Sequence, residues 1–309
     1  MTKKQVLALG GLFLFLLAAL ALIKTGSGDA PPARLCDAAT ASSASSIEIL
    51  QPDAPAIKFV RGASGWEELY PLHYRADPVE LDNFAANICA MKVSQRLYSG
   101  REGLGRFALE AADAVRVRLS NGGAHPLLEF DAGKASSPDS FFVRIFSTPD
   151  GEVREADGLR RESLSLPFAQ WLDKTIYAAL PESITSFTWK RGGQQWTAEK
   201  RGGIWQLERG GKTSRLGPAS GAAVLALARM LADFRADTVL PAQGDGAPAF
   251  REDFSVEITA GGRPNQILLV GSGQDGAPLV KKSGEDRVVF AVQKWKAQKL
   301  LEDFYHLRG

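Results

Sequence analysis

One stretch of this chain has the residue spacing of a phosphate-binding loop. Gly271, Gly273 and Gly276 form a G-x-G-x-x-G pattern after an apolar run. In dinucleotide-binding proteins such a loop leads into a helix whose N-terminus holds the pyrophosphate. Here residues 277–280 are typical of another strand, so no helix N-terminus is predicted. We therefore interpret the pattern as a hairpin turn and expect no cofactor there.

The side chains that commonly bind metals are scattered. His73, His125 and His306 are the three histidines, and none has a second His or a Cys at a metal-ligand spacing. The chain lacks the G-x-S-x-G, H-E-x-x-H, P-loop and S-x-x-K motifs. A Ser/His/Asp triad assembled from distant residues stays open, because triads are spatial. The sequence points to no catalytic, cofactor-binding or metal-binding residue.

Two other groups of residues could act on a ligand. The carboxylates of Glu67–Glu68 and Glu302–Asp303 are adjacent, so they point apart on a strand or helix and are better explained as solvated charges. Tryptophans could form a platform that stacks on carbohydrate. We expect them instead to pack hairpins onto helices; the four are Trp66, Trp189, Trp196 and Trp205.

Composition sets broad bounds on the fold and its partners. The 309 residues are 45% hydrophobic and 23% charged, which is typical of globular proteins and enough for two modest domains. The net charge of +2, with both signs interspersed, argues against a nucleic-acid-binding surface. Two cysteines are too few for a disulfide framework. We expect Cys89 to be a small buried hydrophobe rather than the partner of Cys36, which falls in a flexible stretch.

Residues 1–24 have the pattern of a transmembrane signal anchor. Lys3 and Lys4 precede an uncharged run from Val6 to Ile23, whose helical length of about 27 Å is close to the hydrocarbon thickness of a bilayer. The lysines predict a cytoplasmic N-terminus with the rest of the chain outside. A cleavable signal peptide is the alternative, but its small residues, Ala19-Leu20-Ala21, lie within the apolar run rather than after it.

The remaining chain shows one pattern twice. Residues 25–45 are rich in Gly, Ala, Ser, Pro and Asp and predict a flexible linker. Residues 46–181 and 182–309 then each begin with a strand and a hairpin whose turn contains glycine and whose second strand opens near a tryptophan. In each, a proline (Pro78 or Pro218) starts an amphipathic helix, and alternating strands follow. The first of these helices is expected to have Asp77 as its cap and to run to about Arg96.

This repetition predicts an internal duplication. Each unit is expected to close with a helix, over about 167–180 and from Lys294 to about Leu307. We therefore predict an α+β fold: an N-terminal transmembrane helix followed by two similar units, each a mainly antiparallel sheet packed with helices.

The order of these elements resembles domain-of-unknown-function family 4340, a family of bacterial membrane-anchored envelope proteins. The resemblance rests on Ile47-Glu48-Ile49, the Gly-Trp hairpin and Ala76-Asp77-Pro78. Family members commonly have Tyr-Gly-Leu and then a proline where this chain has Phe107-Ala108-Leu109, so the chain is a divergent member. The family brings no catalytic residues. Some relatives are encoded near ABC-transporter components of the gliding-motility auxiliary type, which implies an accessory role beside a transport complex.

Together these features predict a non-enzymatic single-pass protein of the cell inner membrane, with most of the chain in the periplasm. It would act as a scaffold or accessory component of a membrane complex, for example of ABC type, with an envelope or transporter protein as partner. Sheet edges or the groove between the units would bind that partner. The alternatives are a binding module for an envelope polymer or small ligand, and an envelope hydrolase with a spatially assembled site.

Overall fold

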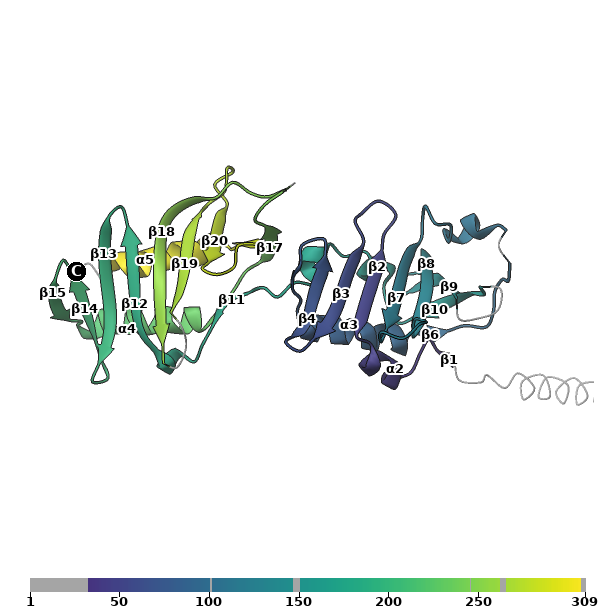
Figure 1. Ribbon diagram of the computed structural model, residues 1–309, viewed down its shortest axis with the longest axis horizontal. Helices are drawn as coiled ribbons and strands as arrows, with labels where there is room; N and C mark the ends of the chain where they lie inside the picture. Colours follow the sequence, from purple (N-terminus) through teal and green to yellow (C-terminus); the bar gives the residue numbers. More distant parts are fainter. Residues whose placement is uncertain (1–32, 101, 147–150, 245, 262–264, 307–309) are drawn as a thin grey trace, which may run out of the picture.

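Antiparallel strands dominate the computed structural model in Figure 1, which describes residues 33–306 except 101, 147–150, 245 and 262–264. Among these residues there are twenty-one strands, four α-helices and four short 3-10 helices. The prediction of an α+β fold is therefore wrong. The alternating apolar pattern extends over far more residues than the helical one, and the architecture is mainly β.

No helix in the described part of the chain is both long and apolar enough to cross a membrane. The transmembrane helix predicted within residues 1–24 lies outside the described residues.

Ten strands form the first sheet. Its alternating residues point to a core that includes Ile47, Phe59 and Phe130, with Ile47 paired to both Phe59 and Leu119 in the neighbouring strands. In spatial order the strands are β1 (Ala33–Arg34), β6 (Lys92–Val93), β10 (Val153–Asp157), β9 (Ser140–Ile145), β8 (Leu128–Ser137), β7 (Val115–Ser120), β2 (Ser46–Leu50), β3 (Ile57–Gly62), β4 (Gly65–Tyr70) and β5 (Tyr74–Arg75).

One amphipathic helix, α3 (Pro78–Ala90), contributes its apolar face to this core. Asp77 caps it by accepting hydrogen bonds from the backbone N–H groups of Val79 and Glu80, and Pro78 occupies the first turn. The predicted start is confirmed. The helix ends at Ala90 rather than near residue 96, because the chain then joins the sheet as β6.

The predicted linker at 25–45 is partly ordered structure. Beyond β1, the short helix α2 (Ala38–Ser43) packs beside α3. Asp37 caps α2 by accepting a hydrogen bond from Thr40 N at 2.7 Å. Hydrogen bonding by the Thr40 side chain, and next by its backbone N–H, lowers the pKa of the Asp37 carboxyl. The flexible-linker prediction is therefore wrong from residue 33 onward.

Nine strands form the second sheet, whose core includes Phe187, Trp189, Val256 and Phe290. Helices α4 (Pro218–Ala232) and α5 (Lys294–His306) accompany it. In spatial order the strands are β15 (Lys212–Arg215), β14 (Ile204–Arg209), β13 (Gln194–Arg201), β12 (Ile184–Arg191), β18 (Arg251–Ala260), β19 (Gln266–Ser272), β20 (Pro278–Lys282), β21 (Val288–Ala291) and β17 (Thr238–Pro241).

We call the first sheet with α2 and α3 the first unit, and the second sheet with α4 and α5 the second unit. The order β5-β4-β3-β2-β7-β8-β9-β10-β6 in the first matches β15-β14-β13-β12-β18-β19-β20-β21-β17 in the second. In each unit a helix follows the first hairpin, α3 after β5 and α4 after β15. Descent of the two units from one duplicated ancestor stays a prediction.

The segment between the units is not the helix predicted for 167–180. It contains the 3-10 helices η2 (Arg161–Leu164), η3 (Phe168–Gln170) and η4 (Pro181–Ser183), and the strand β11 (Thr175–Ala178), which pairs with β16 (Asp233–Arg235). Trp171 packs in the first core, whereas Ile176 packs in the second. An extended chain covers more distance per residue than a helix, so it can reach both cores.

Tyr74 of β5 ties the units together. It is 2% exposed and belongs to the core of the second unit, where its ring lies edge-on to Phe290 at 6.3 Å. Nearby, an ion pair of 3.4 Å joins Asp77 to Arg235 across the junction.

The loop after β6 contains the 3-10 helix η1 (Leu104–Phe107), followed by Ala108 in the left-handed region at φ 53°. This conformation favours glycine, the residue that family members commonly have there. A Cβ on Gly133 of β8 would lie 2.1 Å from the carbonyl oxygen of Phe107. The loop therefore passes directly over the sheet at Gly133.

Candidate functional site

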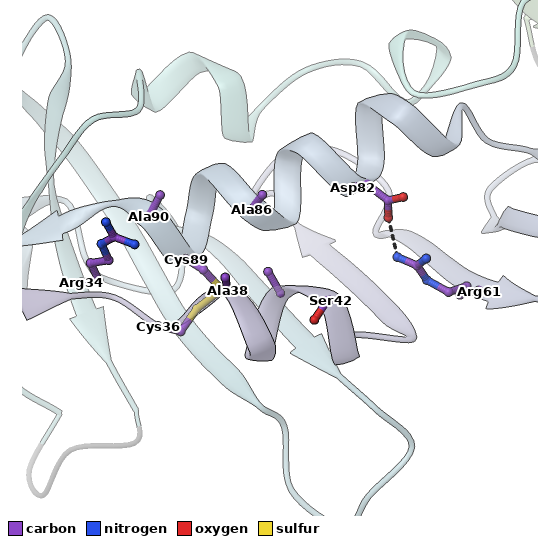
Figure 2. A pocket seen from close by; sticks show the side chains of 10 residues that line it. Arg34, Cys36, Ala38, Ser42, Arg61, Asp82, Ala86, Cys89 and Ala90 are labelled. Atoms are coloured by element: carbon purple, nitrogen blue, oxygen red, sulfur yellow. Dashed lines mark hydrogen bonds and ion pairs between the residues drawn. A yellow bond between two sulfur atoms is a disulfide. The ribbon is translucent and has the colours of Figure 1, made fainter.

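A groove lies between α2 and α3, at the N-terminal end of the described chain (Figure 2). Its volume is about 330 Å³. Small side chains line its walls, and charged side chains lie at its two ends. The lining residues are Arg34, Cys36, Ala38, Ala41, Ser42, Arg61, Asp82, Ala86, Cys89 and Ala90.

A disulfide joins Cys36, in the stretch just before α2, to Cys89 of α3 at this groove. The expectation that Cys89 would be only a small buried hydrophobe is wrong. Backbone bonds bring the cysteines together: Leu35 N donates to Met91 O at 2.8 Å and Cys36 N donates to Cys89 O at 3.2 Å. These bonds hold the stretch before α2 along the end of α3. Cys36 is therefore placed beside Cys89 by backbone pairing and is not part of a flexible linker.

Asp82 of α3 organises one end of the groove. Arg61 forms an ion pair with it, and the indole N–H of Trp66 donates to the same carboxylate oxygen at 2.9 Å. The Arg61 guanidinium also lies 4.5 Å from the centre of the Trp66 ring. These contacts hold the β3–β4 hairpin on α3, so both charges at this end have a structural role.

Arg34 lies at the other end of the groove and is exposed. Within the described chain it has no carboxylate partner at ion-pair distance. Its guanidinium can therefore donate hydrogen bonds to a carboxylate or phosphate oxygen of another molecule. The groove can hold a small apolar group beside such an anion.

Glu68 of β4 is the most buried carboxyl group among the described residues, with no exposed surface. Both of its oxygens accept from Leu72 N, at 3.1 and 3.2 Å. Burial raises the pKa of Glu68, although hydrogen bonds from the backbone N–H groups of Leu72, His73 and Tyr74 oppose the rise. The carboxyl holds the turn that leads to Tyr74 and is closed off from solvent.

The G-x-G-x-x-G stretch is the hairpin turn that its residues predict, between β19 and β20. Gly276 N donates to Gly273 O at 3.1 Å within the turn. A Cβ on Gly271 would lie 2.0 Å from the carbonyl oxygen of Arg251. Close approach of two strands, rather than phosphate binding, therefore accounts for this glycine.

The other candidate residues are dispersed. His73 lies in the turn between β4 and β5 and His125 in the turn between β7 and β8. No three His, Cys, Asp or Glu side chains of the described residues gather as a metal site.

The tryptophans pack as expected from the sequence. Trp66, Trp189 and Trp196 are 2%, 1% and 4% exposed. Trp205 is partly buried and stacks on Phe187, with 5.8 Å between ring centres. The proposed carbohydrate platform would need exposed rings, and these three buried side chains do not provide them.

Comparison with known families adds one finding. The family model described as Domain of unknown function (DUF4340) matches residues 66–253, which is more than half of the chain. The chain belongs to this family. The DUF4340 match begins at Trp66 in the first sheet and ends in β18 of the second, so it spans the junction between the units. No curated protein sequence matches the chain.

Reasoning from the sequence missed the groove and its disulfide. Two signals were present: Asp37 is a helix-capping residue directly before an Ala- and Ser-rich stretch, and an even number of cysteines lies beyond a predicted membrane span. Arg34 carries no sequence signal, because its lack of a carboxylate partner is a property of the folded chain.

Proposed function

We propose that this DUF4340 member is a non-enzymatic, membrane-anchored envelope protein that serves as a scaffold or accessory component of a membrane complex. The bulk of the chain lies on the periplasmic side of the inner membrane. A transporter of ABC type is one such complex.

The Cys36–Cys89 disulfide is the observation that carries this proposal. Disulfides persist in oxidising compartments and are reduced in the cytosol. Residues 3–24, with two lysines before the apolar run, favour export of everything that follows. The bond also ties the stretch just before α2 to α3 in the core of the first unit.

The architecture is consistent with a protein that presents surfaces to partners. Two open sheets place strand edges at opposite ends of an elongated arrangement (Figure 1). Such edges bind extended segments of other proteins through backbone hydrogen bonds. The charged side chains described in the groove and at the junction mostly pair with one another, which is typical of structural contacts.

Crosslinking and mass spectrometry on native membranes test this function. The full-length protein should crosslink reproducibly to the same envelope or transporter subunits through lysines of the sheet units. A matched strain carries the Cys36→Ser and Cys89→Ser substitutions, which lower the stability of the first unit. Crosslinks that are lost in this strain depend on the folded first unit. Recovery of no envelope or transporter protein, from membranes in which the wild-type chain is abundant, would overturn the proposal.

A further inference from the structure

The first unit has an extended segment bound along its β5 edge. Asp77 N donates to Trp171 O at 2.8 Å, and Asp173 N donates to Arg75 O at 3.0 Å. Ala76 and Leu172 form an antiparallel bridge between these two bonds. The segment 171–173 thus adds a short strand to the edge, in the manner by which sheets bind peptides.

Side chains reinforce this contact. Trp171 is 4% exposed, and its ring lies 4.7 Å from that of Phe84 on α3. The Asp173 carboxylate lies 3.4 Å from the Arg75 guanidinium. The edge therefore recognises an apolar residue followed two positions later by a carboxylate.

The second unit contains the same edge. Leu216 N donates to Trp205 O at 3.2 Å, as Ala76 N donates to Trp66 O at 2.9 Å. An arginine stands three residues before the proline that begins each helix, Arg215 before Pro218 as Arg75 stands before Pro78. Arg215 therefore occupies in the second unit the position of Arg75 in the first.

No described strand lies beyond β15, and all four of its residues are exposed. Gly217 N, the counterpart of Asp77 N, makes no backbone hydrogen bond with the described residues. Arg215 likewise has no ion pair among them. A cavity of about 440 Å³ opens beside this edge, lined in part by Ile204, Trp205 and Leu216.

We propose that the β15 edge binds an extended segment of a partner protein that carries an apolar residue and, two positions later, a carboxylate. The apolar side chain fills the cavity, the backbone pairs with Gly217 N–H and Arg215 C=O, and the carboxylate pairs with Arg215. This proposal rests on the proposed scaffold function, which requires a partner protein, and it specifies the segment by which that partner binds. A second copy is a poor occupant, because antiparallel pairing of two β15 edges brings Lys212 and Arg215 of both copies together.

A fluorescein-labelled peptide copying residues 168–175 of this chain is a suitable probe, because it contains the natural occupant of the β5 edge. Fluorescence anisotropy with the full chain in detergent should show saturable binding, and the same peptide with Asp173→Lys should bind about tenfold more weakly. Arg215→Glu in the protein should weaken binding of the unmodified peptide by a similar factor. Lys58→Glu, which makes the same charge change at an exposed position of β3 in the first unit, should leave peptide binding unchanged.

Gly217→Pro tests the backbone contact separately. Gly217 has φ −65° and ψ 169°, which proline adopts readily, and nothing lies within 4 Å of a Cβ built there. The substitution therefore removes the outward N–H while the fold is retained, which circular dichroism confirms. We expect peptide affinity to fall about fivefold.

Absence of saturable binding, or binding that neither Arg215→Glu nor Gly217→Pro weakens, would overturn the β15 proposal. Either result is distinct from failure of the scaffold function, which the membrane crosslinking reports independently. A chain that crosslinks to envelope partners but does not bind the peptide retains its proposed function and uses another surface.

Discussion

Removing the Cys36–Cys89 bond should destabilise the first unit and leave the second unchanged. The bond closes a loop with a sequence separation of 53 residues, which contains β2, β3, β4 and most of α3. The loss of unfolded-chain entropy for a loop of this length corresponds to about 4 kcal/mol. Engineered and natural disulfides often contribute less, so we expect a decrease of about 2–4 kcal/mol in the free energy of unfolding.

Urea unfolding of the Cys36→Ser, Cys89→Ser double variant measures this effect. With a denaturant slope of about 2 kcal/mol per molar, the midpoint of the first unit should fall by about 1–2 M. Hydrogen exchange read by mass spectrometry assigns each transition to one sheet. A reductant should shift the wild-type midpoint by the same amount and leave the double variant unchanged. Equal midpoints for oxidised wild type and the double variant would refute the argument, as would an equal shift in both sheets.

Three further substitutions test other parts of the structure. Glu68→Ala should cost about 1–3 kcal/mol because Leu72 N–H loses its acceptor, whereas Glu68→Gln retains an acceptor. Burial raises the pKa of Glu68 above its ordinary value of 4.5, so its protonation favours the folded state at low pH, and this advantage is lost as pH rises through the raised pKa. Wild type should therefore gain stability relative to Glu68→Gln as the pH falls from neutral toward 4.5; no gain over that range would contradict the assignment. Ala108→Gly should raise stability by about 0.5–1 kcal/mol in thermal unfolding, because glycine relieves the left-handed conformation; a destabilised variant would show that the conformation is not strained. Tyr74→Ala should cost about 3 kcal/mol in the transition of the second sheet, whose core contains the Tyr74 ring, whereas Tyr70→Ala, at a side chain 54% exposed, should have little effect on either transition; similar losses for both would show that Tyr74 does not tie the units together.

The sequence predicted local elements well where one pattern was sufficient. The β3–β4 hairpin closes on Trp66, and α3 begins at Pro78 with Asp77 as its cap, as their residue types required. Both depend on interactions within a few residues, which a single sequence contains. The end of α3 was predicted too late, because the exit of the chain into β6 depends on the distant strand β10.

The segment around Trp171 shows why the fold class was wrong. Its apolar spacing fits a helix, but its side chains divide between two cores, and the chain becomes extended to reach both. The candidate sites depend on the same kind of long-range contact. Cys36 meets Cys89 only because Leu35 pairs with Met91, and the open edge at Arg215 becomes recognisable only by comparison with the filled edge at Arg75.

Thiol trapping in intact cells tests the central claim most directly, because the chain has only two cysteines. Cells are lysed directly into denaturant with a polyethylene-glycol maleimide, with and without prior reduction. A periplasmic chain with the Cys36–Cys89 bond should gain no polymer before reduction and two polymers after it. Two polymers gained without reduction would show free thiols in the cell and would contradict both the bond and the oxidising compartment.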